Sequence, residues 1–170
     1  MGKSCCFTGH RKVRPEYHIR QITTRKIIEL IEKRGVEDFY NGGSYGFDFI
    51  AGDIVCELKK TYTSVKLHMV LPCCKEDQTR FWYPRSIDDY DKLLSLADSV
   101  EYISERYYDG CMRDRNEALV GLTSDYCLCY VNPHIYRSGS AQTMRMAKKR
   151  GLKIINLFED PKPVWQTIAF

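Results

Sequence analysis

A glycine-rich run at residues 41–48 is the part of the sequence whose residue types point most clearly to chemistry. It contains Asn-Gly-Gly-Ser-Tyr-Gly-Phe-Asp and follows a short apolar segment. Glycine allows positive φ angles and lets a ligand approach the main chain without a Cβ atom in the way. Amides at the start of a following helix favour an anion. The run predicts a phosphate-binding turn. A plain strand-to-helix turn is the alternative, because the run lacks the spacing of dinucleotide and P-loop fingerprints.

Three further segments carry polar or glycine-rich residues where predicted strands end. They start at Thr8, at Pro72 and at Asn132. The carboxyl ends of parallel strands meet at one edge of a sheet, where ligands bind. We therefore expect these segments to converge with the glycine-rich run. The residues expected to contact a ligand are Thr8, Gly9, His10, Arg11, Gly42, Gly43, Ser44, Gly46, Asp48, Arg115, Asn116, Ser138, Gly139, Ser140 and Thr143.

Individual side chains in these segments have both functional and structural interpretations. Arg11 offers a guanidinium fork for phosphate, or is a surface arginine. Asp48 would hold ribose hydroxyls or a metal, or would complement the dipole of its helix. Ser138 would belong to a second phosphate cradle or simply cap a helix. The candidates for acid–base catalysis are His10, Asp48 and Glu76, although a histidine at a strand end is more often structural.

The bulk composition is that of a globular domain. The chain has 170 residues, of which 44% are hydrophobic and 28% are charged, with a formal net charge of +4. We expect a single domain over residues 1–170 with a C-terminal tail at 161–170. The mild positive charge suits a small anion and does not favour nucleic acid.

The eight cysteines do not have the spacing of a metal site or a disulfide framework. We expect them to be free and buried as small hydrophobic side chains, which predicts a reducing compartment. Cys127 and Cys129 alternate in an expected strand and should share one face. No apolar run approaches the ~20 residues that a membrane span needs. The sequence therefore predicts a cytoplasmic protein without membrane insertion and without a metal site.

Apolar spacing predicts strands alternating with helices along the chain. Strands are expected at 4–8, 36–41, 65–71, 100–103, 126–131 and 153–158. Helices are expected at 17–34, 47–60, 86–97 and 112–122, and a last one follows Ser138-Gly139-Ser140 and runs to 150. Gly35 should end the first helix, and Ser86–Asp89 reads as a capping box for the third. This order predicts an α/β fold, a Rossmann-like doubly wound domain with a mostly parallel sheet and helices on both faces.

Several motifs together resemble the YpsA-like branch of the SLOG superfamily. That superfamily also contains the Lonely-guy phosphoribohydrolases and the DNA-processing protein A. The resemblance covers residues 5–157, nearly the whole chain, in loose motifs whose order is specific. Its motifs are Thr8-Gly9-His10-Arg11, Gly42-Gly43 with Gly46 and Asp48, Pro72 with Glu76 and Gln78, Trp82, Tyr90, Ala97-Asp98, Tyr107, Arg115-Asn116 and the turn from Gly139 to Thr143.

The resemblance implies a Rossmann-like fold with a pocket for a nucleotide, ADP-ribose or an NAD-like ligand. It implies a bacterial or phage context, with links to cell division or stress. The Lonely-guy signature Pro-Gly-Gly-x-Gly-Thr-x-x-Glu is absent. The corresponding residues 138–145 are Ser-Gly-Ser-Ala-Gln-Thr-Met-Arg, with no acidic residue to assist N-glycosidic cleavage.

These observations favour binding or sensing of a nucleotide-derived ligand, with no other cofactor expected. One alternative is a nucleotide-processing hydrolase, either an N-glycosidase or a phosphohydrolase. A second alternative is a protein-interaction module with a vestigial pocket. In that case Trp165 and the tail would contact a protein partner or a second copy in a homo-oligomer.

Overall fold

A computed structural model describes residues 2–159 as one six-stranded sheet with helices on both sides. The strands are β1 (Lys3–Gly9), β2 (Val36–Asn41), β3 (Lys66–Leu71), β4 (Ser99–Tyr102), β5 (Tyr126–Tyr130) and β6 (Lys153–Asn156). The helices are α1 (Glu16–Arg34), α2 (Phe47–Leu58), α3 (Lys75–Gln78), α4 (Pro84–Leu96), α5 (Cys111–Leu122) and α6 (Gly139–Lys149).

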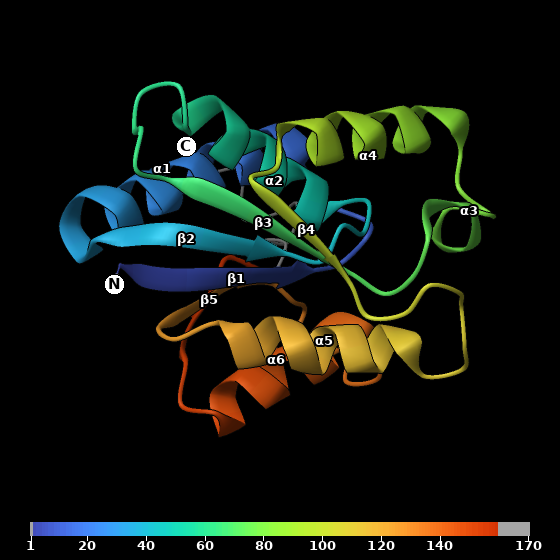
Figure 1. Ribbon diagram of the computed structural model, residues 1–170. Helices are drawn as coiled ribbons and strands as arrows, with labels where there is room; N and C mark the ends of the chain where they lie inside the picture. The colour runs from blue at the N-terminus through green and yellow to red at the C-terminus, as the bar shows by residue number, and fades with distance from the viewer. Residues whose placement is uncertain (1, 160–170) are drawn as a thin grey trace, which may run out of the picture.

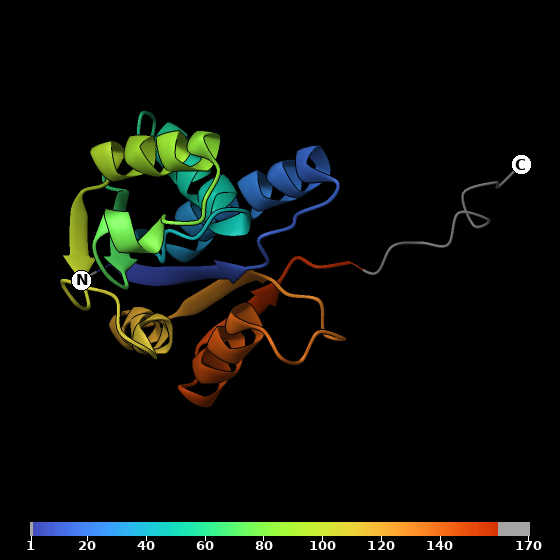
Figure 2. The same cartoon turned by 90° about the vertical axis from the view of Figure 1, so that its right-hand side faces the viewer.

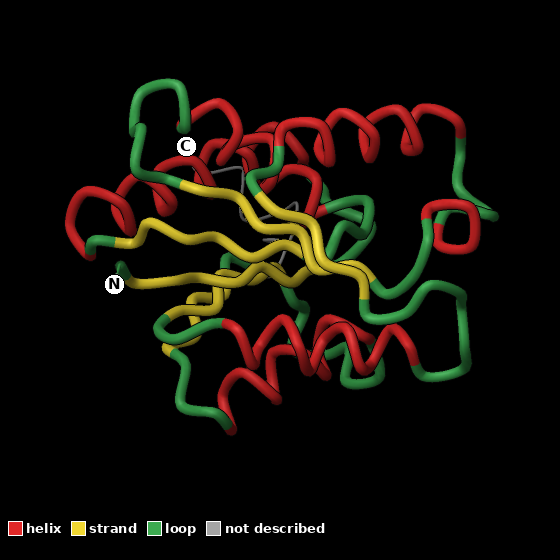
Figure 3. Tube along the Cα trace, in the orientation of Figure 1, coloured by secondary structure: helices red, strands yellow, loops and turns green. Residues whose placement is uncertain are grey.

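All pairs of neighbouring strands are parallel, in the order β4-β3-β2-β1-β5-β6. Helices α1, α2 and α4 cover one face of the sheet, and α5 and α6 cover the other (Figures 1 and 2). Figure 3 shows the strands as a single layer between the two groups of helices. The predicted Rossmann-like α/β fold is confirmed.

The apolar residues form one core on each face of the sheet, because successive side chains of a strand point to opposite faces. Phe7 and Leu128 belong to the core beneath α1 and α2. Cys6, Cys127 and Cys129 belong to the core beneath α5 and α6, all fully buried. The shared face of Cys127 and Cys129 is confirmed. All eight cysteines lie within the described residues and none forms a disulfide.

The ends of several helices follow the local chemistry of the sequence. Gly35 ends α1 with a left-handed φ of 75°. Ser138 caps α6, since its Oγ accepts a hydrogen bond of 3.0 Å from the amide of Ala141. The predicted capping box at Ser86 is wrong, because α4 already begins at Pro84. Proline suits the first position of a helix, where no amide donor is needed.

The sequence pattern did not predict the short helix α3. Helix α3 has four residues, too few to produce an apolar period. The predicted tail at 161–170, with Trp165, lies outside the described residues. Between residues 2 and 159, no helix has the length and apolar character that crossing a bilayer requires.

Candidate functional site

The order of the strands reverses between β1 and β5, and a cavity of about 600 Å³ lies at that point. The final residues of the two strands, Gly9 and Tyr130, are paired neighbours. Open parallel sheets bind their ligands at this topological switch point. We refer to this space as the switch cavity. It is lined by Phe7, Thr8, Gly9, His10, Arg11, Lys12, Gly42, Ser44, Asp48, Met112, Arg115, Asn116, Leu119, Tyr130, Asn132, Ile135, Ser138, Gly139, Ser140, Thr143 and Phe158.

Thirteen of the fifteen residues expected to contact a ligand line this cavity, and Gly43 and Gly46 do not. A Cβ atom on Gly43 would lie 2.6 Å from Cδ2 of Leu71, so this glycine faces the core. A Cβ atom on Gly46 would lie 2.5 Å from Cα of Arg11, where two loops pack together. Both residues have positive φ angles, of 69° and 92°. Their glycine identity follows from packing and backbone conformation within the protein.

The buried side-chain amides of Asn41 and Gln78 hold the glycine-rich run in place from inside the protein. The side chain of Asn41 accepts a 2.9 Å hydrogen bond from the amide of Gly43 and donates a 2.7 Å bond to the carbonyl of Asp48. Gln78 donates to the carbonyl of Gly43 at 3.2 Å and accepts from the hydroxyl of Tyr90 at 3.0 Å. The turn is therefore held rigid by side chains that lie outside the cavity.

Asp48 is the buried acid of the switch cavity. Only 6% of its surface is exposed, and one carboxylate oxygen, Oδ1, has no hydrogen-bond partner among the described residues. The other oxygen accepts a 3.3 Å hydrogen bond from the amide of Ser44. Burial raises the pKa of Asp48 to about 6, against the opposing charges of Arg115 and Arg11. A carboxyl group with one unused oxygen can accept a hydrogen bond from a ligand hydroxyl.

Arg115 is the buried, positively charged side chain of the same cavity. Its guanidinium donates to the carbonyl of Gly42 and, at 2.8 Å, to the side-chain oxygen of Asn116. A Cβ atom on Gly42 would lie 2.9 Å from Nη1, so the guanidinium occupies the space beside this glycine. Burial lowers the pKa of Arg115, and the charge of Asp48 opposes that shift. Arg115 therefore places a fixed positive charge beside the glycine-rich run.

His10 links three segments at the edge of the sheet. Its Nε2 accepts a 2.8 Å hydrogen bond from the amide of Asn132, and its Nδ1 lies 3.2 Å from Oγ of Ser140. Because Nε2 acts as an acceptor, the neutral ring carries its proton on Nδ1 and donates it to Ser140. Burial lowers the pKa of His10, which favours this neutral form. The ring thus positions the start of α6, and its basic nitrogen is already engaged.

The start of α6 presents polar groups to the cavity. The first amides of a helix have no acceptor within the helix, so those of Gly139 and Ser140 suit an anion. Thr143 is 1% exposed and donates its hydroxyl proton to the carbonyl of Gly139 at 2.8 Å. The glycine-rich run is less suited to an anion, since the amides of Gly43 and Ser44 already have side-chain acceptors. Phosphate therefore fits α6 better than the run that first suggested it.

The third acid–base candidate, Glu76, lies apart from the other two. It belongs to α3 and lines a different hollow, together with Lys75 and Tyr102. His10 and Asp48 both line the switch cavity. The described residues contain no group of three or more histidine, cysteine, aspartate or glutamate side chains that would hold a metal ion.

Several cavity residues were missed by reasoning from polar motifs. Tyr130 and Phe158 stand 5.3 Å apart between ring centroids and form part of an apolar wall. Met112, Leu119 and Ile135 add further apolar surface. The position of Tyr130 at the end of a strand was the available signal, because strand ends line the switch point. The remaining apolar residues resemble ordinary core residues in the sequence.

The fold and this cavity define a Rossmann-like α/β protein with its site at the topological switch point. The chain matches the family model described as the YspA SLOG family over residues 6–157. It therefore belongs to the YpsA family of SLOG proteins.

Curated relatives carry the family name UPF0398. A protein of this name from Halalkalibacterium halodurans is 30% identical over 136 residues, covering 78% of this chain and 69% of the relative. One from Shouchella clausii is 31% identical over 117 residues, covering 67% of this chain and 61% of the relative. One from Staphylococcus aureus is 29% identical over 97 residues, covering 56% of this chain and 50% of the relative. The matched region thus spans between half and about two thirds of these bacterial relatives.

Proposed function

We propose that the switch cavity binds a nucleotide-derived ligand, such as a nucleotide, ADP-ribose or an NAD-like molecule. The protein would act as a cytoplasmic binding or sensing domain in a bacterial or phage setting. The observation that carries the proposal is the carboxyl group of Asp48, which is buried at the cavity with one oxygen unpartnered among the described residues. A buried polar atom without a partner calls for a ligand group or a water molecule at that place.

Different parts of the cavity suit different parts of such a ligand. Asp48 would accept a hydrogen bond from a ribose hydroxyl. Phosphate oxygens would meet the first amides of α6 and the guanidinium of Arg11, which lies at the rim. A base would lie against the apolar wall that includes Tyr130 and Ile135. The cavity volume of about 600 Å³ is in the range of small-molecule sites.

A thermal-shift panel of nucleotides, ADP-ribose and NAD tests the proposal. At least one compound should raise the melting temperature of the natural protein. Asp48→Ala should abolish that shift, whereas Asp109→Ala, which removes an exposed carboxylate outside the cavity, should keep it. If no compound in the panel shifts either the natural protein or the control, the proposal fails.

A hydrolase is the second candidate function, and the raised pKa of Asp48 favours it. A carboxyl group with a pKa of about 6 can exchange a proton near neutral pH. The hydrogen bonds of His10 fit a positioning role better than that of a base. Release of free base or phosphate from the panel, lost in Asp48→Asn, would support turnover. Continued release by that variant would remove Asp48 from the mechanism.

A further inference from the structure

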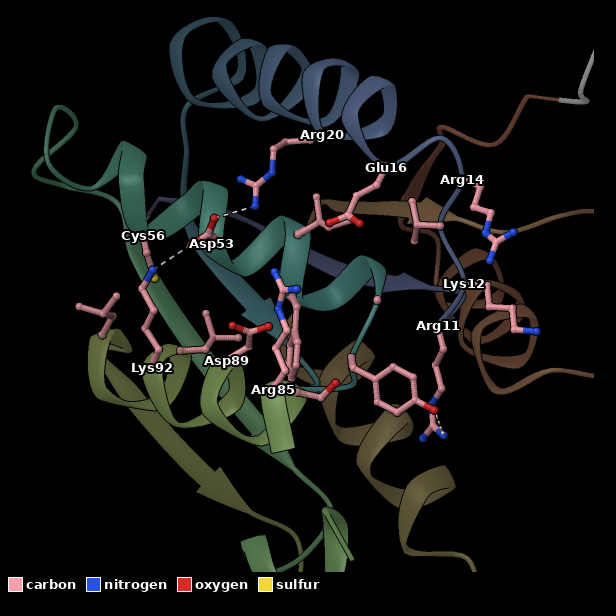
Figure 4. Close-up of a pocket in the computed structure, with 18 residues that line it drawn as sticks. Arg11, Lys12, Arg14, Glu16, Arg20, Asp53, Cys56, Arg85, Asp89 and Lys92 are labelled. Carbon is pink, nitrogen blue, oxygen red and sulfur yellow. Dashed lines mark hydrogen bonds and ion pairs between the residues drawn. The ribbon is translucent and has the colours of Figure 1, made fainter. Parts of the chain in front are cut away.

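A second cavity, of about 540 Å³, lies between α1, α2 and α4 and opens at the loops that follow β1 and β2 (Figure 4). We refer to it as the helical groove. Gly46, which packs closely against the backbone of Arg11, lines this groove, and Arg11 and Lys12 line both the groove and the switch cavity. The groove is lined by Arg11, Lys12, Val13, Arg14, Glu16, Arg20, Tyr45, Gly46, Phe49, Ile50, Asp53, Cys56, Arg85, Ser86, Asp89, Lys92, Leu93 and Leu96.

Positive side chains outnumber negative ones in the groove. Its lining contains six arginine and lysine side chains and three carboxylates. Arg20 of α1 and Lys92 of α4 share the carboxylate of Asp53, at 2.7 and 3.7 Å. Arg85, by contrast, forms no ion pair with any described residue, and its guanidinium points into the groove from α4 in Figure 4. Arg20 points toward the same space from the opposite side.

The remaining cations extend the positive charge to the open end of the groove. Arg11 lies over the ring of Tyr45 at 4.5 Å and donates to its hydroxyl at 3.3 Å, so its guanidinium is held at the rim. Lys12 and Arg14 project from the loop beside it and form no ion pair among residues 2–159. Cations from three separate segments therefore surround one concave space, and only Arg20 and Lys92 among them pair with a carboxylate of the described residues.

This arrangement matches the chemistry of phosphate. The guanidinium of arginine presents paired donors that fit phosphate oxygens, and four of the six cations are arginines. The volume suits a small molecule, and the walls are formed by helices on both long sides. Glu16 and Asp89 leave two carboxylates that can accept hydrogen bonds from hydroxyl groups of the same molecule.

We propose that the helical groove is a second ligand site, which binds a small, multiply phosphorylated molecule through Arg85, Arg20 and Arg11. The proposal does not depend on what the switch cavity binds. Because Arg11 and Lys12 line both spaces, an anion in the groove would compete for the same cations as a phosphate at the cavity rim. Occupancy of the groove would then weaken binding in the switch cavity.

Calorimetric titration with inorganic tripolyphosphate at low ionic strength tests this site. The natural protein should bind the probe, and Arg85→Glu should weaken binding by about tenfold or more, the loss expected for a charge-assisted contact. Arg25→Glu makes the same change of charge at an exposed position of α1 outside the groove, and should change binding by less than about threefold. Ser140→Glu places a negative charge in the switch cavity and should also leave tripolyphosphate binding within about threefold.

The following outcomes would contradict the proposed ligand site in the helical groove. Equal affinity of Arg85→Glu and the natural protein would do so, as would an absence of tripolyphosphate binding at low ionic strength. Loss of binding in Ser140→Glu with retention in Arg85→Glu would place the phosphate in the switch cavity instead. A response to single-stranded DNA or an acidic peptide without a response to tripolyphosphate would contradict a small-molecule site. The nucleotide panel is read separately on Arg85→Glu, so failure of one site is distinguished from failure of the other.

Discussion

The switch cavity and the helical groove differ in how their charged side chains are buried and paired. In the switch cavity, Asp48 and Arg115 are each 6% exposed, and their neighbours fix them in place. In the helical groove, Arg85 is exposed and has no ion-pair partner among the described residues. Under the two proposals, the cavity would select its ligand by shape and fixed hydrogen bonds, whereas the groove would attract its ligand by charge that salt can screen.

Replacing Arg115 in the switch cavity should lower the free energy of unfolding more than any other change considered for the two sites. Arg115→Met removes the donors to Gly42 and Asn116 and the positive charge that most opposes the raised pKa of Asp48. We expect a loss of about 3 kcal/mol in the free energy of unfolding, measured by urea denaturation at pH 7.5. The control Arg113→Met, on an exposed side chain of the same helix, should stay within about 0.5 kcal/mol. Equal losses for both variants would contradict a special role for Arg115.

Asn41→Ala tests whether the glycine-rich run is braced from inside. The change leaves the amide of Gly43 and the carbonyl of Asp48 unpaired in a buried place. Denaturant unfolding should show a loss of about 2 kcal/mol. Asn132→Ala, which removes one exposed hydrogen bond to the amide of His134, should cost less than about 1 kcal/mol. A smaller loss for Asn41 than for Asn132 would show that the brace contributes little.

Asp48→Asn tests the raised pKa of the buried acid. Because the folded-state pKa is about 6 and the ordinary value is 3.8, the folded protein binds the proton more tightly than the unfolded chain. The carboxyl group therefore destabilises the fold progressively as pH rises from about 4 to about 6. At pH 7.5 Asp48→Asn should gain about 3 kcal/mol of stability, and at pH 4 the gain should vanish. A gain that is the same at both pH values would show that the pKa is not raised.

Changes in the helical groove should affect stability least. Arg85→Gln removes an exposed charge without an ion pair, so the free energy of unfolding should change by less than about 0.5 kcal/mol. Thermal unfolding in low and high salt measures this. A loss above about 1 kcal/mol would mean that Arg85 supports the fold and is not reserved for a ligand.

The sequence predicted those parts of the fold that local chemistry decides. The stop at Gly35 follows from residue type alone, since a left-handed helix end favours glycine, and the cap at Ser138 is one of the two roles that its residue type predicts. The start of α4 was predicted wrongly, because Ser86 fitted a capping box while Pro84 set the actual first turn. Two local signals predict different helix starts in this segment, and the helix begins at the proline.

The convergence of the site segments could also be predicted, because parallel strands bring their carboxyl ends together. The internal roles of Gly43 and Gly46 could not, since they depend on Leu71 and on the loop at Arg11. The burial of Asp48 likewise depends on tertiary packing, which brings Arg115 and Arg11 near its carboxyl group. Motif order located the cavity, but only tertiary packing separated the residues that face it from those that support it.

The hydrogen bond expected between Asp48 and a ribose hydroxyl gives the most direct test of the proposed function. The measurement is a calorimetric comparison of AMP with 2′,3′-dideoxy-AMP on the natural protein and on Asp48→Ala. We expect the natural protein to bind AMP at least about tenfold more tightly, and Asp48→Ala to bind both compounds equally weakly. Equal affinity for the two compounds on the natural protein would contradict the assignment of Asp48 to a ribose.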